Sequence, residues 1–176
     1  GYLNTNRPIV SIDQERTPLM ESILVVALFS RHMPAFDWAR DRIASEWGPI
    51  SLESPLFDFC DTDYYLPSMG AGIRKGFLAV EGIFDAAELA SRKRQAIQWE
   101  EECRADGGYP DIRPINMDPG YLNLSKLVLA STKERAHRVY LNQGIFGEVT
   151  MRYVGGWQFY PWTYPDYQRP ESLKFF

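Results

Sequence analysis

Apolar and polar positions in the first part of the chain predict a strand and then a helix. Ser22–Ser30 (SILVVALFS) is apolar on both faces and β-branched in its middle, which indicates a central strand covered on two sides. After Pro34, which suits a helix start, apolar residues recur at helical spacing until Gly48-Pro49. These apolar positions are Phe36, Ala39, Ile43 and Trp47. The pattern therefore predicts a buried strand followed directly by an amphipathic helix.

Three further segments have the pattern of strands. Ile50–Phe59 contains Pro55, which cannot donate to a ladder and so indicates an edge strand. Gly76–Phe84 is more apolar and suits a central strand. Ile112–Met117 contains Pro114 and again suits an edge. Two edge strands and two central strands are thus expected.

A second helix is expected between the last two of these strands. Asp85 is a suitable N-cap, and Glu88 three residues later completes a capping box before a segment that reaches about Arg104. The resulting order is βαββαβ, with both prolines in the strands that a ferredoxin-like sheet places outermost. We therefore predict an α+β fold with a ferredoxin-like antiparallel sheet and two helices.

The last third of the chain predicts an extension of this sheet. Leu122–Ala130 is interpreted as a short helix, and strands are expected at about 135–141, 145–154 and 157–160. A loop at 142–144 would place Arg138 opposite Glu148, Val139 opposite Gly147 and Leu141 opposite Ile145. The prediction is a C-terminal β-meander.

Length and composition suit a compact protein. With 176 residues and 45% hydrophobic positions, the chain fits one domain, here 21–176, with a ferredoxin-like part at 21–118 and the extension at 119–176. Residues 1–20 resemble an N-terminal arm. The apolar run 23–29 is far shorter than the roughly 20 residues of a membrane helix and lacks signal-peptide flanks. No membrane association is expected.

Charge and motifs exclude several classes of function. The formal net charge of -4 gives no basic field for phosphate backbones, so nucleic acid is an unexpected partner. Cys60 and Cys103 belong to no CxxC pair, which favours a reducing compartment, the cytoplasm. The chain has no P-loop and no GxSxG elbow. No cofactor is indicated.

Several segments together resemble a known family. They are GPISLESPLFDFCDTDYY at 48–65, NMDPGYLNLSKLVLASTKERAHRVYLNQGIFGEVTMRY at 116–153, PWTYPDY at 161–167 and the RPE that follows. Over roughly 24–176 the chain resembles the uncharacterised bacterial family called Domain of Unknown Function 4416. The family has no established activity, so the resemblance assigns no catalytic residue.

The leading candidate site lies after the fourth predicted strand. A small anionic metabolite, for example a phosphorylated one, would be bound between the sheet and the meander by charge-assisted hydrogen bonds. The ligand-binding candidates are Tyr121, Lys126, Lys133, Arg135 and Arg138. If the protein is an enzyme, Asp118, His137 and Glu148 would supply acid–base chemistry. The alternative is an exposed turn with solvated charges.

His137 has two interpretations. In the register above it shares a face with Val139 and Leu141, which predicts a hydrogen-bonded core histidine. If it instead points into a cleft beside Glu148, its ordinary pKa near neutrality would suit proton transfer.

Two other functions remain open. The aromatic strip from Trp157 to Tyr167, followed by Phe175-Phe176, would pack on its own sheet or join subunits, for example in a homodimer, or bind a partner without chemistry. A divalent-metal hydrolase would need Asp58, Asp61 and Asp63 to converge with Asp118. Turn-forming aspartates at the end of an edge strand explain the first three equally well.

Overall fold

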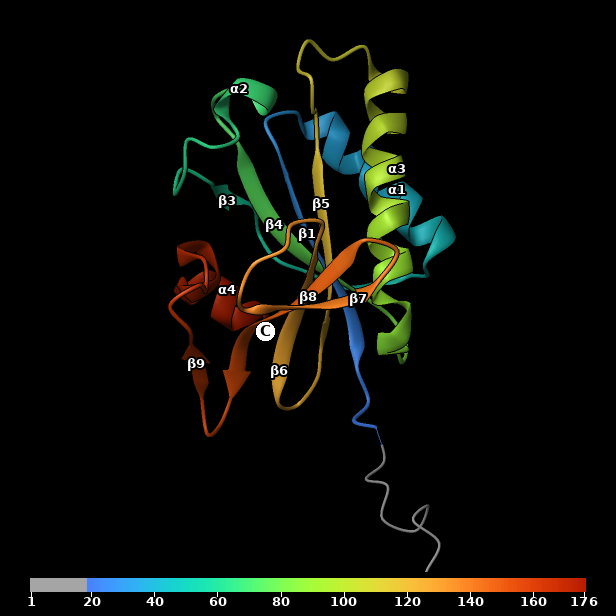
Figure 1. Ribbon diagram of the computed structural model, residues 1–176. Helices are drawn as coiled ribbons and strands as arrows, with labels where there is room; N and C mark the ends of the chain where they lie inside the picture. The colour runs from blue at the N-terminus through green and yellow to red at the C-terminus, as the bar shows by residue number, and fades with distance from the viewer. Residues whose placement is uncertain (1–18) are drawn as a thin grey trace, which may run out of the picture.

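The structure is a computed structural model that describes residues 19–176. Residues 1–18, which make up most of the expected N-terminal arm, lie outside the described residues. In chain order the elements are β1 (Ile23–Ser30), α1 (Met33–Glu46), β2 (Ile50–Glu53), β3 (Phe57–Asp58), α2 (Leu66–Met69), β4 (Arg74–Val80), the 3₁₀ helix η2 (Ala86–Glu88), α3 (Leu89–Gly107), β5 (Asn116–Leu122), β6 (Lys126–Ser131), β7 (Arg138–Asn142), β8 (Ile145–Tyr153), β9 (Trp157–Phe159), the 3₁₀ helix η3 (Pro165–Gln168) and α4 (Pro170–Phe175) (Figure 1).

The strands form a nine-stranded antiparallel sheet. Its path is β2-β4-β1-β5-β6-β8-β7, while β3 pairs with β4 and β9 pairs with β8. The predicted mixture of helices with an antiparallel sheet is therefore confirmed. The sheet is larger than the four-stranded layer that the sequence predicts, and its strand order does not establish the ferredoxin-like topology. No helix in the described part of the chain combines the length and apolar character needed to cross a membrane.

Strand β1 lies inside the sheet and is buried on both faces, as its apolar sequence predicts. Leu24, Val26 and Leu28 face α1 and α3 and join the larger core. Val25 and Ala27 face the opposite way, toward the C-terminal segment. Because the helices cover one face and α4 covers the other, the sheet has an apolar core on each side (Figure 1).

The two long helices begin near the predicted positions. Helix α1 has Pro34 in its first turn and ends before Gly48, whose φ of +126° suits glycine. The side chain of Asp85 accepts a hydrogen bond from the N–H of Ala87 and caps η2, which leads into α3. Glu88 does not complete a capping box, since its carboxylate instead pairs with Arg92 at 2.9 Å.

Three expectations for single elements were wrong. The segment 50–59 is not one strand, because it divides around Pro55 into β2 and β3, although β2 does lie at the edge. Strand β5 begins at Asn116, after Pro114, and it lies inside the sheet between β1 and β6. The segment 122–130 contains strand β6 in place of a helix, because the Asn123 side chain accepts from two backbone N–H groups and forms a hairpin turn.

The meander is present, with one change of register. Arg138 pairs with Glu148 and Val139 with Gly147, as predicted, but an irregularity after Tyr140 places Asn142 opposite Ile145. The predicted pairing of Leu141 with Ile145 is therefore wrong. The turn needs left-handed backbone at Gln143 (φ 53°) and Gly144 (φ 72°), and two such residues suit a tight hairpin.

The C-terminal aromatic segment packs on the sheet face opposite α1 and α3 (Figure 1). Tyr167 is buried against Phe77, and Phe175 and Phe176 contact the same ring at centroid distances of 5.7 and 5.0 Å. Of the two packing modes expected for the aromatic strip, the structure has the one in which the strip packs on its own sheet. Tyr164 remains exposed, and it contributes to the site described next.

Candidate functional site

The sheet divides where β6 leaves β5. These strands pair only between 120–122 and 127–129, after which β6 continues along β8 and leaves 116–119 without a partner on that side. A pocket of about 220 Å³ lies at this fork. Its lining is Tyr64, Tyr65, Lys93, Ile97, Glu100, Arg113, Asn116, Asp118, Leu129, Ala130, Ser131, Thr132, Lys133, Arg138, Glu148 and Tyr164.

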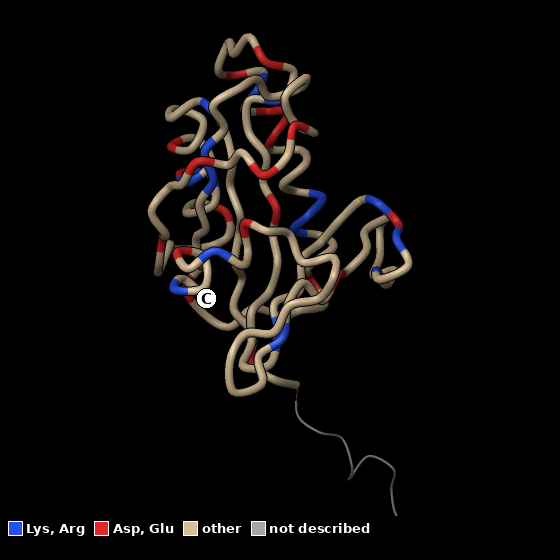
Figure 2. Tube along the Cα trace, turned by 90° about the vertical axis from the view of Figure 1, so that its left-hand side faces the viewer, with Lys and Arg blue, Asp and Glu red and all other residues tan. Residues whose placement is uncertain are grey.

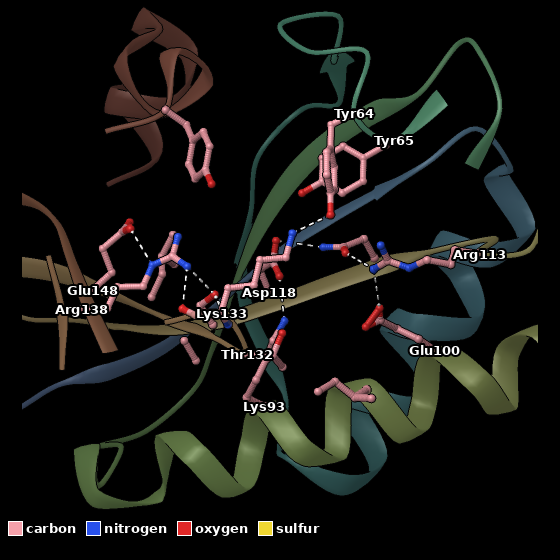
Figure 3. Close-up of a pocket in the computed structure, with 16 residues that line it drawn as sticks. Tyr64, Tyr65, Lys93, Glu100, Arg113, Asp118, Thr132, Lys133, Arg138 and Glu148 are labelled. Carbon is pink, nitrogen blue, oxygen red and sulfur yellow. Dashed lines mark hydrogen bonds and ion pairs between the residues drawn. The ribbon is translucent and has the colours of Figure 1, made fainter. Parts of the chain in front are cut away.

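Acidic and basic positions are spread over the molecule, and neither sign dominates the side seen in Figure 2. The pocket is different because charged groups of both signs converge there. Figure 3 shows Arg138 and Glu148 on one side, Arg113 and Glu100 on the other, and Asp118 between them. The lining comes from seven separate stretches of the chain, so the fold alone brings it together.

Asp118 is the central carboxylate. Its two oxygens accept hydrogen bonds of 2.8 Å from Lys93 Nζ and Asn116 Nδ2, and Lys93 also donates to the carbonyl of Met117 at 3.3 Å. Burial alone would raise the pKa of Asp118, but the charge and hydrogen bond of Lys93, together with the charge of Lys75 and the hydrogen bond from Asn116, hold that pKa below its usual value. Asp118 is therefore an ionised acceptor at neutral pH.

Glu100, on helix α3, lies to one side of Asp118 (Figure 3). Arg113 donates to Glu100 Oε2 at 3.3 Å and also to the side-chain oxygen of Asn116. Burial raises the pKa of Glu100 to about 7, although the charges of Lys93 and Arg113 oppose this. Near neutral pH the group is therefore present in both protonation states, which is the property required for proton transfer.

The other side of the pocket is held by Arg138 and Glu148. Arg138 donates to Glu148 at 3.1 Å, to Ser131 Oγ at 2.9 Å and to the carbonyl of Lys133 at 2.8 Å. Glu148, only 3% exposed, is also in contact with His137 Nε2 at 2.8 Å and accepts from Thr150 at 3.1 Å. Since both Glu148 oxygens are engaged, this group positions Arg138.

Lys133 reaches from the loop after β6 to Tyr64 (Figure 3). Its ammonium donates to the Tyr64 hydroxyl at 2.5 Å and lies 4.4 Å from the ring centroid. The Lys133 hydrogen bond lowers the pKa of Tyr64. Within residues 19–176 Lys133 has no carboxylate at ion-pair distance, in contrast to Lys93, Arg113 and Arg138.

A family model matches this chain. The model, described as a domain of unknown function, DUF4416, covers residues 20–176. The chain belongs to the DUF4416 family. Searches of curated proteins and of solved structures gave no match. The DUF4416 match includes every residue that lines the pocket, but its description names no activity, so function has to be argued from the site itself.

Four of the residues that sequence analysis proposes for the site line the pocket of this DUF4416 protein: Asp118, Lys133, Arg138 and Glu148. Tyr121 instead packs against the helix-side core, and Arg135 is exposed with its guanidinium on the carbonyl of Glu134. Lys126 lies opposite Arg152 in the β6–β8 ladder. This is the far end of β6, five residues and roughly 16 Å from Ser131. These three do not take part in the pocket.

His137 is half-buried beside Glu148, and its ring stacks on Trp162 at a centroid distance of 4.8 Å. It is not among the residues that line the pocket. His137 thus lies beside Glu148, as the second interpretation requires. It does not point into the pocket, however, so it has no access to a ligand bound in the pocket.

Six polar residues of the lining were not expected at this site from the sequence: Tyr64, Tyr65, Lys93, Glu100, Arg113 and Asn116. The sequence does contain a pattern that could have identified two of them, Lys93 and Glu100. Lys93 and Glu100 occupy the same face of α3 as the buried residues Leu89, Ala96 and Cys103, at helical spacing. A charged residue within an apolar stripe is uncommon unless it has a buried partner. Arg113 and Asn116 carry no comparable signal.

The aspartates proposed for a metal site do not converge. Within residues 19–176 no group of three or more His, Cys, Asp or Glu side chains is placed so that it could hold a metal ion. Asp61 pairs with Arg169 at 3.0 Å and Asp58 with Arg74 at 3.7 Å, whereas Asp118 lies in the pocket. The arrangement therefore lends no support to a hydrolase with these ligands.

Proposed function

We propose that this DUF4416 protein binds a small anionic metabolite, for example a phosphorylated one, in the pocket at the fork between β5 and β6. The observation that carries the proposal is the charge of the lining. Four cations (Lys93, Arg113, Lys133 and Arg138) face three carboxylates (Glu100, Asp118 and Glu148), which gives a net charge of +1 with every carboxylate ionised. Of these four cations, Lys133 is the one that forms no ion pair within residues 19–176, so we propose that it anchors the anionic group of the ligand.

The size and surface of the pocket also favour a small polar ligand. Its volume of about 220 Å³ is below the roughly 300–1,000 Å³ of sites for drug-sized molecules. Tyr65, Thr132 and Tyr164 also line it and carry hydroxyl groups, which can both donate and accept hydrogen bonds. Where chemistry accompanies binding, Glu100 is the group suited to proton transfer, because burial raises its pKa to about 7 and its Oε1 has no donor within residues 19–176.

Calorimetric titration with inorganic phosphate and glycerol 3-phosphate tests this proposal. Lys133→Gln is expected to weaken binding at least tenfold, because it removes the one cation that is not already paired. Lys126→Gln is the matched control, since it removes a second lysine of the same region that lies outside the pocket. Both variants are expected to keep the melting temperature of the wild type.

Two results would contradict the proposal. The first is wild-type protein that binds neither anion at millimolar concentration. The second is a Lys133→Gln variant that binds both as tightly as Lys126→Gln, because the anchor would then lie elsewhere.

We also propose that the first part of the chain is a ferredoxin-like unit within one domain, 21–176, of a cytoplasmic protein. The order β2-β4-β1-β5, with α1 and α3 packed on one face, supports the first point. Two cysteines that form no disulfide suit the reducing cytoplasm. A crystal structure with α1 and α3 on opposite faces, or proteolysis that releases a stable fragment ending near 118, would contradict the fold proposal.

A further inference from the structure

The hydrogen-bonding capacity left over in the pocket describes its ligand. Lys133 uses one of its three N–H donors, on Tyr64, and Arg113 uses only one of its terminal nitrogens, NH2. The donors that remain suit an anion with several acceptor oxygens. A phosphate group has such oxygens and carries close to two negative charges at neutral pH.

The acceptors left over need a different partner. Glu100 accepts only at Oε2, so its Oε1 has no donor within residues 19–176. Each oxygen of Asp118 has one donor and keeps a second lone pair. A bare anion would leave these acceptors unsatisfied and would be repelled by Asp118. The ligand must therefore also carry hydrogen-bond donors.

Hydroxyl groups fit these acceptors better than an ammonium group does. The charge of Asp118 is already balanced by Lys93 at 2.8 Å. Burial raises the pKa of Glu100 to about 7, so this carboxyl group offers only part of a negative charge to a cation. A hydroxyl can accept from the protonated form of Glu100 and donate to the ionised form, so it is suited to both states.

The remaining wall suits a short carbon chain. The side chains of Ile97 and Leu129 supply apolar surface, and the rings of Tyr65 and Tyr164 line the same pocket. Its volume of about 220 Å³ limits the length of the ligand.

We infer that the pocket takes a short phosphorylated polyol, of the size of glycerol phosphate, with its phosphate toward Lys133 and Tyr64 and its hydroxyls toward Glu100 and Asp118. This inference rests on the proposed function and deepens it, because it specifies both ends of the ligand and their orientation.

A matched pair of ligands tests the hydroxyl end. Glycerol 3-phosphate and propyl phosphate have the same carbon chain and phosphate and differ only in two hydroxyls. The full chain is expected to bind glycerol 3-phosphate at least tenfold more tightly in calorimetric titration, because a site built to hydrogen-bond hydroxyls discriminates against an analogue that lacks them. Glycerate, with a carboxylate in place of phosphate, is expected to bind more weakly than glycerol 3-phosphate.

Variants separate the two ends of the site. Lys133→Gln is expected to weaken both members of the pair by a similar factor. Glu100→Met is expected to abolish the preference for glycerol 3-phosphate, whereas Glu100→Gln, which keeps an acceptor oxygen, retains most of it. If Glu100→Met does not fold, the ratio of the two affinities in the wild type and in Glu100→Gln decides the question.

Equal affinity of wild type for glycerol 3-phosphate and propyl phosphate would overturn this inference and leave the proposed function standing. Tighter binding of glycerate than of glycerol 3-phosphate would overturn the assignment of phosphate. Failure to bind any of these ligands or inorganic phosphate would overturn the inference and the proposed function together.

Discussion

Two lysine–aspartate pairs in this protein have the same chemistry and opposite surroundings. Lys75 of β4 lies 2.5 Å from Asp166, with side-chain exposures of 4% and 2%. Lys93 of α3 lies 2.8 Å from Asp118, which is 26% exposed and opens on the pocket. The ammonium of Lys75 is also within 4.6–5.7 Å of four ring centroids, those of Phe29, Phe59, Phe77 and Tyr167.

The difference shows that the burial of an ion pair decides whether its free lone pairs can reach another molecule. The sealed pair is buried and fixes the C-terminal segment against the sheet, because Asp166 would otherwise be a buried charge without a counter-ion. The open pair leaves each Asp118 oxygen with one donor and a second lone pair beside the pocket. The two are also coupled, since the charge of Lys75 contributes to the lowered pKa of Asp118, after the larger influences of burial and Lys93.

Breaking the sealed pair is expected to have the largest effect on stability. Lys75→Met keeps the length of the side chain but leaves Asp166 buried and unpaired, which costs about 3–5 kcal/mol. Urea unfolding measures this loss. Lys174→Met, at an exposed position of α4, should change the unfolding free energy by less than about 0.5 kcal/mol.

A double variant sharpens this prediction. Lys75→Met combined with Asp166→Leu removes both charges and is expected to recover at least half of the loss, because replacing a whole buried pair is far less costly than leaving one partner. A loss below about 1 kcal/mol in the single variant would show that Asp166 reaches solvent when Lys75 is removed.

Glu100, in the open region, is expected to make stability depend on pH. Its pKa in the folded protein is about 7, above its ordinary value of 4.5, so the folded state favours the protonated form. The resulting stabilisation is complete below about pH 4.5 and is lost as pH rises through 7, by roughly 3 kcal/mol in total. Glu100→Gln lacks this loss.

Urea unfolding at several pH values between 4 and 8 measures this pH-dependent change in the free energy of unfolding. Glu101→Gln removes an exposed neighbouring carboxylate and should keep the pH dependence of the wild type. Identical profiles for the wild type and Glu100→Gln would mean that burial does not raise the pKa of Glu100.

Breaking the open pair is expected to have the smallest of these effects. After Lys93→Met, Asp118 keeps its hydrogen bond from Asn116 and its contact with solvent, so the loss of unfolding free energy is roughly 1–2 kcal/mol. The pKa of Asp118 should rise at the same time, because the main influence lowering it is gone. If Lys93→Met proved as costly as Lys75→Met, the contrast between sealed and open pairs would be wrong.

The fold could be predicted furthest where local signals are strong. The all-apolar segment at β1, the apolar stripe of α1 and the cap at Asp85 each identify an element without reference to the rest of the chain. The hairpin after Leu122 could not be recognised in this way. Leu127 and Val128 are adjacent and both buried, because β6 is covered on both faces, and the sequence of such a strand resembles that of a short buried helix.

The site could be predicted only in part. Asp118, Lys133, Arg138 and Glu148 were identified because they lie within one stretch of the sequence, in β5 and in the segments that follow it. Proximity in sequence also suggested Lys126, which lies at the far end of β6, and Arg135, whose exposed guanidinium lies on the carbonyl of Glu134. Tyr64 lies 69 positions before Lys133, so no local pattern could join them.

The sequence by itself determined that the chain forms strands and amphipathic helices with an antiparallel sheet, because hydrophobic periodicity and turn residues act over short distances along the chain. Only the tertiary structure decided where β6 parts from β5, and with it which charged side chains share a pocket. It also decided which of two lysine–aspartate pairs is sealed and which is open, because burial depends on segments that are remote in sequence and meet only when the chain is folded.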